Sequence, residues 1–306
     1  RWFEPSRVHH PPPSTDRNGS RRTGAPSHAQ HFSIENFTRI GQCCKSRAPR
    51  GAATFRICKF HDVSWASPIE RNSTNKFVER AQAYPEKRSP DTRRADFLEI
   101  GAPFAEDAAR AQAGRCSQCG VPYCQSHCPL HNHIPDWLRL TAEGRLQEAY
   151  DLSARTSTMP EICGRICPQD RLCEGNCVIE FSGHGAVTIG SVEKYLGDNA
   201  WENGWVRPIE PGTPTGQSVG VIGAGPAGLT AAEYLRRAGY EVDIYDRHDR
   251  AGGLLIYGIP AFKLDKSVVD RRVARIEEGG ITIHRGVEVG KDVTLSELRE
   301  RHDAVF

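Results

Sequence analysis

Residues 218–228 read Ser-Val-Gly-Val-Ile-Gly-Ala-Gly-Pro-Ala-Gly, a short apolar run followed by three closely spaced glycines. The run has the length of a buried strand, and the residues from Pro226 to Ala238 show a helical pattern that Gly239 ends. A strand, a glycine-rich turn and a helix in this order are typical of a Rossmann-like fold. The stretch therefore predicts an α/β domain that holds a dinucleotide at the helix N-terminus.

The three glycines have distinct expected roles. Gly223 makes the tight turn, Gly225 lets the backbone approach a pyrophosphate, and Gly228 lets the helix pack closely on the strand. An acid is expected about 20 residues further on, where it binds a ribose hydroxyl. Asp246 follows the predicted strand 241–245 and fits this role. An acid there disfavours a 2′-phosphate, so FAD or NAD is expected rather than NADP.

Strand and helix patterns alternate after this motif. We expect a helix over residues 265–278, strands over 281–284 and 286–289, and a last helix opened by the capping box Thr294-Leu-Ser-Glu297. This alternation predicts a parallel sheet.

Eight of the eleven cysteines lie upstream in two clusters. The first has the spacing C-x2-C-x4-C-x3-C-P over Cys116–Pro129, and the second has C-x3-C-P-x4-C-x3-C over Cys163–Cys177. The first spacing resembles ferredoxin ligation of iron–sulfur clusters. Four-cysteine zinc sites and structural thiols are the alternatives, but zinc ribbons usually show paired C-x2-C knuckles and only one such pair is present. Iron–sulfur clusters are therefore favoured.

The clusters lie among helical patterns, over 104–113, from Ile134 to Leu152 with a break at Gly144, and from Val192 to about Trp205. The chain thus predicts an α region followed by an α/β region. The expected parts are an extension over 1–75, a helical [4Fe-4S] domain over 76–206, a linker over 207–217 and a truncated FAD-binding domain over 218–306.

The first 56 residues hold nine Arg, one Lys and three acids. Such a start is typical of a transit peptide, but a disordered or non-native extension is favoured. Cys43, Cys44 and Cys58 lie in the extension and match no ligand pattern. The only Met is Met159, so we expect the chain to be a fragment at both ends.

The composition favours some function classes over others. The net charge of +2 gives no sign of a nucleic-acid or anionic-membrane partner. No apolar run approaches the roughly 20 residues of a membrane helix, and no secretory signal is visible. A cytoplasmic protein is expected. No side chain has the pattern of an acid–base catalyst.

Three stretches carry a resemblance to a known family. They are Cys116–Pro129 continued by Leu-His-Asn-His-Ile-Pro-Asp-Trp137, the run Pro160–Gly175, and the run Gly252–Leu264. Residues from about Arg94 to Phe306 resemble the small-subunit family of bacterial NADPH-dependent glutamate synthases. The same module is similar to the N-terminal part of dihydropyrimidine dehydrogenase and to related NADPH:ferredoxin oxidoreductase subunits.

The resemblance implies two [4Fe-4S] clusters with interleaved ligands. Cys116, Cys119, Cys124 and Cys177 would hold one cluster, and Cys128, Cys167 and Cys173 the other. Glu193 matches the position of the fourth ligand of the second cluster, and Cys163 competes for that place.

The resemblance also implies FAD contacts. The matching positions are Gly223, Gly225, Pro226, Ala227, Asp246, Gly253, Leu254, Lys263 and Val289. The glycine-rich motif itself adds Gly228 to the expected cofactor-binding residues. The NADPH domain of the family would follow after residue 306.

The implied function is electron transfer from NADPH through FAD and the clusters to a large (alpha) subunit that makes glutamate from glutamine and 2-oxoglutarate. The alternatives are another NADPH-linked reductase, ferredoxin- or pyrimidine-linked, and a non-enzymatic zinc-binding module. We expect the chain alone to be inactive.

Overall fold

A computed structural model describes residues 75–306, which lie within one compact unit, Ala66–Phe306. The predicted extension over residues 1–75, with its three cysteines, lies outside the described residues except for Asn75. The proposed domain bounds at 206 and 217 remain predictions.

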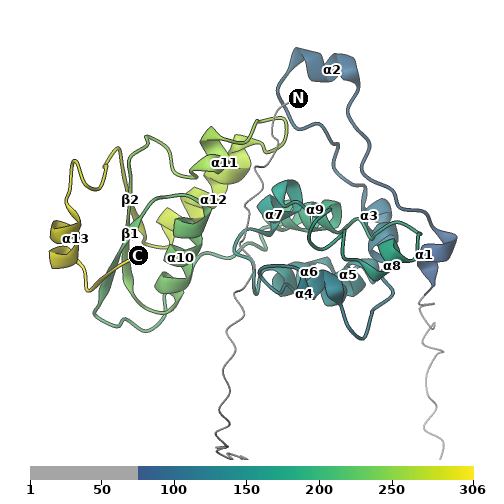
Figure 1. Ribbon diagram of the computed structural model, residues 1–306, viewed down its shortest axis with the longest axis horizontal. Coiled ribbons are helices and arrows are strands. Elements are labelled where there is room, and N and C mark those ends of the chain that lie inside the picture. The colour runs from purple at the N-terminus through teal and green to yellow at the C-terminus, as the bar shows by residue number, and fades with distance from the viewer. Residues whose placement is uncertain (1–74) are drawn as a thin grey trace, which may run out of the picture. The chain divides into compact units, whose positions relative to one another are not determined.

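The first part of the unit is helical (Figure 1). Its helices within the described residues are α1 (Lys76–Glu79), α2 (Pro90–Ala95), α3 (Glu106–Ala113), α4 (Tyr123–Ser126), α5 (Ile134–Ala142), α6 (Leu146–Ser153), α7 (Pro160–Ile166), α8 (Val178–Phe181) and α9 (Ile189–Glu202). Its core includes the fully buried Trp137, Val192 and Leu196. The thiols of Cys116, Cys124, Cys128 and Cys173 pack against this core.

The second part is the predicted α/β region. Its elements are β1 (Ser218–Ile222), α10 (Pro226–Arg237), β2 (Glu241–Asp246), α11 (Leu254–Tyr257), α12 (Lys266–Glu278), β3 (Thr282–Arg285), α13 (Leu295–Arg301) and β4 (Ala304–Val305). The strand order is β3-β2-β1-β4, and all three pairs of neighbours are parallel. Figure 1 shows α10 and α12 on one face of the sheet and α13 on the other. The chain therefore changes face between β3 and β4, and the switch point, where such sheets bind ligands, lies between β1 and β4.

Helix α7 belongs to both parts. It makes its most extensive contacts with α9 of the helical part. Its residue Ile162, together with Met159 just before it, is nevertheless buried in the same apolar cluster as Val221 of β1 and Ile244 of β2. One short helix therefore packs in the core of the sheet and carries a cysteine of the second run.

Two sequence predictions need correction. Residues 286–289 do not form a strand, because Gly286 and Gly290 take left-handed φ values of 72° and 96° and turn the chain, leaving a single bridge from Val289 to Val293. The second cysteine run is not wholly a loop, because Cys163 lies within α7. By contrast, the capping box of Thr294 and Glu297 is confirmed at the start of α13.

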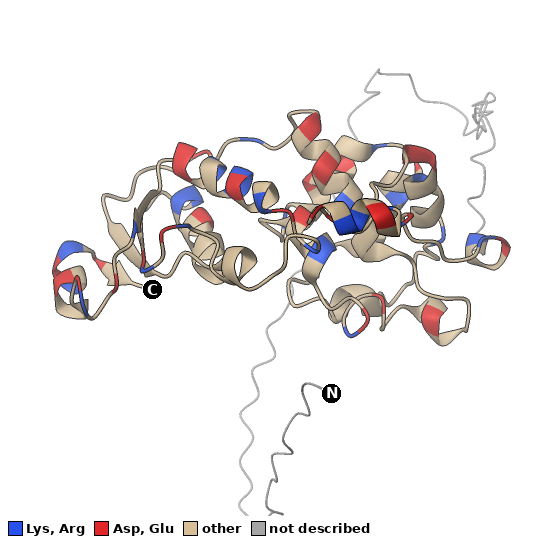
Figure 2. Ribbon diagram, turned by 90° about the horizontal axis from the view of Figure 1, so that it is seen from above, with Lys and Arg blue, Asp and Glu red and all other residues tan. Residues whose placement is uncertain are grey.

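Acidic and basic residues are interspersed along the ribbon of both parts (Figure 2). No helix in the described range, 75–306, is both long and apolar enough to cross a membrane.

Candidate functional site

The glycine-rich turn lies where β1 meets α10. Gly223 follows β1 with a left-handed φ of 101°, and its N–H donates to the carbonyl of Tyr245 on β2 at 2.8 Å. Gly225 is the N-cap residue of α10, and Pro226 occupies the first helical turn. Proline suits that position because the first N–H groups of a helix have no partner within the helix. The turn thus directs the N-terminus of α10 toward the space beyond β1.

The surroundings of the glycines separate their roles. A Cβ on Gly228 would lie 1.9 Å from the carbonyl oxygen of Gly223, so this position requires glycine for packing. A Cβ on Gly223 or Gly225 would meet nothing within 4 Å. The space in front of the turn is therefore open on the side where a pyrophosphate would approach, which fits a dinucleotide.

Asp246 ends β2 beside this turn and is 7% exposed. Its Oδ2 accepts the N–H of Ala224 at 2.7 Å, and its Oδ1 accepts the N–H of His248 at 2.8 Å. The His248 ring lies 3.0 Å from the same Oδ1. These bonds hold the carboxylate against the glycine-rich turn.

The other residues predicted to contact the flavin differ in whether they lie beside the glycine-rich turn. The N–H of Gly252 donates to Ala224 at 2.7 Å, and a Cβ on Gly253 would lie 2.9 Å from the Cα of Gly225, so this segment packs on the turn. Leu254, at the start of α11, is 72% exposed beside it. The ammonium of Lys263 makes no hydrogen bond or ion pair within residues 75–306. Val289 packs instead with Tyr245, Val293 and Leu298.

Four thiols of the helical part converge on one small cavity. Its lining includes the side chains of Cys116, Cys119, Cys124 and Cys177, with apolar neighbours such as Leu138 and Ile189. Burial raises the pKa of Cys116 to about 11 and that of Cys124 to about 12, and the charges of the other thiols act in the same direction. Buried thiols that repel one another as thiolates suit a cationic metal cluster, which would neutralise them.

Cys128, Cys167, Cys173 and Glu193 form a second group. These four residues are close enough to interact electrostatically, because the negative charges of Cys128, Cys173 and Glu193 each act to raise the pKa of the Cys167 thiol. The pKa of Cys167 is nevertheless lowered, because the thiol of Cys163 donates a hydrogen bond to it.

Burial raises the pKa of the Glu193 carboxyl well above its usual range. Its only hydrogen bond within the described residues comes from the hydroxyl of Ser153 at 3.5 Å. No basic side chain of residues 75–306 pairs with it. A buried carboxyl group without a basic partner fits a place beside a metal, whose positive charge would stabilise its ionised form.

The eight cysteines from Cys116 to Cys177 are free thiols. Nowhere in residues 75–306 do three His, Cys, Asp or Glu side chains converge closely enough to chelate one ion. In a four-iron cluster each thiolate binds a different iron, so its ligands lie further apart than those of a single ion.

An ionic network joins the helical part to the α/β region. Arg165 of α7 contacts Glu99 at 2.6 Å and Asp198 of α9 at 2.8 Å. Asp198 also pairs with Arg271 of α12 at 2.9 Å, and Glu99 accepts the N–H of Asp265 at 3.1 Å. These contacts were not predicted, because no sequence pattern marks which distant charges meet.

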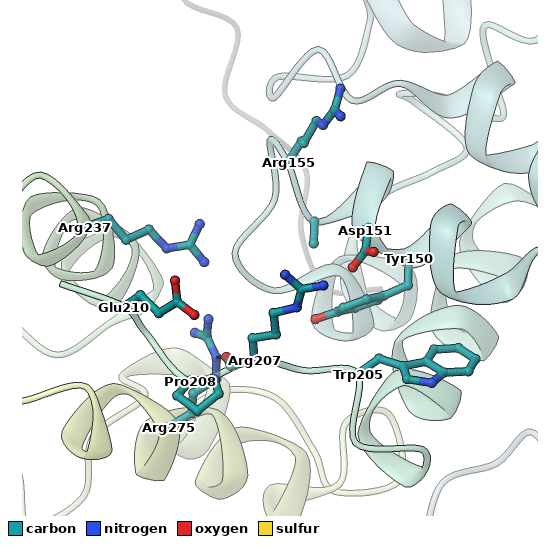
Figure 3. Close-up of a pocket in the computed structure, with 10 residues that line it drawn as sticks. Tyr150, Asp151, Arg155, Trp205, Arg207, Pro208, Glu210, Arg237 and Arg275 are labelled. Atoms are coloured by element: carbon teal, nitrogen blue, oxygen red, sulfur yellow. Dashed lines mark hydrogen bonds between the residues drawn. The ribbon is translucent and has the colours of Figure 1, made fainter. Parts of the chain in front are cut away.

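A separate cleft of about 480 Å³ lies away from the predicted residues. Figure 3 shows Arg237 and Arg275 on one side, Tyr150 and Asp151 on the other, and Arg207 between them. Arg237 and Arg275 share the buried carboxylate of Glu233 as their partner. None of the predicted cysteine or flavin-binding residues lines this cleft.

Comparison with known protein families agrees with this arrangement. The family model of dihydropyrimidine dehydrogenase domain II, 4Fe-4S cluster, matches residues 93–205, and that of an NAD(P)-binding Rossmann-like domain matches residues 221–273. The predicted order, an iron–sulfur region followed by a Rossmann-like region, is confirmed.

Known relatives cover much of the chain. The "Glutamate synthase [NADPH] small chain" of Azospirillum brasilense is 65% identical over 230 residues, which are 75% of this chain and 48% of that protein. The protein of the same name in Escherichia coli is 50% identical over 232 residues, again 75% and 48%. The "Putative oxidoreductase AegA" of Escherichia coli is 49% identical over 235 residues, 75% of this chain and 36% of that protein. The chain thus spans about half the length of the small chains it matches, and the resemblance to them is confirmed.

Proposed function

We propose that this chain is the electron-transferring part of a glutamate synthase small subunit. The observation that carries the proposal is the convergence of Cys116, Cys119, Cys124 and Cys177 on one cavity, in the region that matches a 4Fe-4S family model. The 65% identity to a glutamate synthase small chain supports the same activity. The whole protein would be an NADPH-dependent oxidoreductase whose partner is a large subunit that forms glutamate from glutamine and 2-oxoglutarate.

The cofactors that we propose are two [4Fe-4S] clusters and FAD. When bound, the flavin would accept a hydride from NADPH and the clusters would pass electrons one at a time. Cys116, Cys119, Cys124 and Cys177 would hold one cluster, and Cys128, Cys167, Cys173 and Glu193 the other. Free thiols and clusters suit a reducing compartment, so we propose the cytoplasm.

The protein would contribute binding and orientation. The N-terminus of α10, presented by Gly223 and Gly225, would stabilise the pyrophosphate charge. Asp246, held in place by the N–H of Ala224, would accept a ribose hydroxyl. Pro226, Ala227, Gly253, Leu254, Lys263 and Val289 are the further proposed flavin contacts.

To test this proposal, the protein is purified without oxygen and its content of flavin, iron, zinc and acid-labile sulfide is measured. We expect about eight irons and eight sulfides for each flavin, because a [4Fe-4S] cluster carries four of each. We also expect glutamine- and 2-oxoglutarate-dependent NADPH oxidation once a large subunit is added. Zinc without sulfide would overturn the iron–sulfur assignment.

A second candidate is another NADPH-linked reductase built on the same module. The 49% identity to the putative oxidoreductase AegA favours it over the zinc-binding module. NADPH oxidation that needs ferredoxin or a pyrimidine, and ignores glutamine with 2-oxoglutarate, would select this candidate.

The eighth ligand has its own test. Glu193→Ala is expected to remove one cluster and leave about four irons, whereas Cys163→Ser is expected to keep both. The reverse outcome would assign the place to Cys163.

A further inference from the structure

The side-chain amide of Gln118 lies against the sulfur of Cys116. Its Nε2 is 3.2 Å from Cys116 Sγ and 2.8 Å from the carbonyl oxygen of Pro135 at the start of α5. An amide nitrogen carries two hydrogens, so both contacts can be made at once. The bond to Pro135 therefore fixes the amide in the orientation that directs its other N–H at the sulfur.

The backbone of Gln118 reinforces this contact. Its φ of 53° is left-handed, a conformation that residues other than glycine keep only where their surroundings hold them. Gln118 is thus held in place with a side-chain N–H directed at the sulfur of Cys116, and substitution can remove this N–H.

The second cysteine group has a different environment. Among the described residues no side-chain amide donates to Cys128, Cys167 or Cys173. The side-chain donor to Cys167 is the thiol of Cys163, a weaker donor than an amide. The second group has the carboxyl group of Glu193 in the place of a fourth thiol, so the ligand charge of the two groups is the same and the amide donor is what distinguishes them.

N–H groups directed at a cluster sulfur stabilise the more negative, reduced state, and carboxylates destabilise it. We propose that Gln118 raises the reduction potential of the cluster held by the Cys116 group, and that this cluster has the higher potential of the two. This inference rests on the proposed function, because it needs both clusters to be present. Gln118 would act as a tuning residue and not as a ligand.

The experiment is a redox titration of the purified holoprotein, followed by electron paramagnetic resonance. Gln118→Leu removes the donor and keeps similar bulk. Gln118→Glu replaces the amide with a carboxylate of the same shape. Gln125→Leu is the matched control, because Gln125 lies in α4 between the cysteines of the same run and its side chain makes no hydrogen bond within residues 75–306. Iron, sulfide and flavin are measured for every variant.

For Gln118→Leu we expect the signal of one cluster to titrate at a lower potential. At a fixed potential, the ratio of oxidised to reduced cluster should rise threefold to tenfold. For one electron this is about 30 to 60 mV. Gln118→Glu should move the same signal further down, and Gln125→Leu should leave both signals in place. A purely structural role would change the cluster content and not the potential.

The proposal is overturned if Gln118→Leu keeps both clusters and both potentials, or if the signal that moves is the lower of the two. Absence of clusters from the unsubstituted protein would instead overturn the proposed function. If the Gln118→Leu variant loses its cluster, the Gln118→Glu variant provides the test instead. An unchanged reduction potential of the cluster in Gln118→Glu would then overturn the proposal.

Discussion

The guanidinium of Arg272 contacts both carboxylate oxygens of Glu161, with Nη2 at 2.8 Å from each oxygen and Nε at 3.0 Å from Oε1. The two side chains are only 2% and 0% exposed. Trp201 donates to Oε1 at 3.2 Å, and its ring lies 5.0 Å from the Arg272 guanidinium carbon. This pair fastens α7, which carries Cys163, to α12 of the α/β region.

We predict that Glu161→Gln lowers the free energy of unfolding by about 3 to 5 kcal/mol, because it leaves Arg272 charged and buried without a counter-charge. The measurement is urea denaturation. Glu143→Gln is the control, because Glu143 pairs with Arg139 at the surface, where such a pair contributes about 0 to 1 kcal/mol. Equal losses in the two variants would contradict the prediction.

The lowered pKa of the Glu99 carboxyl makes the stability of the protein depend on pH. Burial acts to raise the pKa of this carboxyl, but hydrogen bonds from Lys194 and Arg165 outweigh it and hold the pKa below the usual 4.5. A lowered folded-state pKa stabilises the fold above the unfolded pKa, and this contribution is lost as the pH falls through the folded pKa. The window therefore lies below pH 4.5.

We expect Glu99→Gln to destabilise the protein at pH 7, by a difference that shrinks toward about pH 3.5. Urea midpoints of both proteins across this range provide the test. A difference that stays constant with pH would show that the charge of Glu99 is not the cause.

Two alanine substitutions separate folding from dinucleotide binding. Gly225→Ala adds a methyl group that meets nothing within 4 Å, at an ordinary φ of −78°. We expect near-normal stability and at least tenfold weaker flavin binding, because the methyl group occupies the approach of the pyrophosphate. Gly228→Ala should lower stability as well, since its Cβ would clash with Gly223. Thermal denaturation and flavin retention measure the two effects, and normal flavin binding in Gly225→Ala would contradict the assignment.

Gly164 allows α7 and α9 to approach each other. A Cβ on Gly164 would lie 2.4 Å from the backbone nitrogen of Lys194 and 2.6 Å from the carbonyl oxygen of Gly190. Gly164→Ala should force the helices apart, cost about 1 to 3 kcal/mol or more, and lower the content of the cluster assigned to Glu193. Iron analysis and denaturation test this. Gly101→Ala, whose Cβ would meet nothing within 4 Å, should behave like the unsubstituted protein.

The fold was predictable where local patterns agree with packing. The close packing of Gly228 on Gly223 and the capping box of Thr294 and Glu297 are contacts between residues a few positions apart, and both formed as expected. The strand predicted over 286–289 failed for a physical reason. The alternation of Val287 and Val289 reflects burial against Tyr245 and Leu298, which requires no strand pairing.

The cysteine groups were predictable only in part. Spacing identified the eight thiols, but it could not show that Cys177 lies with Cys116 or that Cys128 lies with Cys167, since these pairs are distant in sequence. The α7 helix was missed because its glycine, proline and cysteine content resembles that of a loop. Its Pro160 in the first turn and Gly164 against α9 are instead what helix initiation and close packing require.

Because α7 packs against both the helical part and the sheet, the two parts cannot be separated cleanly between them. A cut in the predicted linker, residues 207–217, would separate the sheet from Met159 and Ile162, which complete its core. The severed α/β piece would expose an apolar hollow to water and tend to self-associate. The iron-binding and nucleotide-binding halves are therefore not interchangeable modules. They should melt in a single cooperative transition, and any evolutionary exchange of the nucleotide-binding half would have to bring α7 with it.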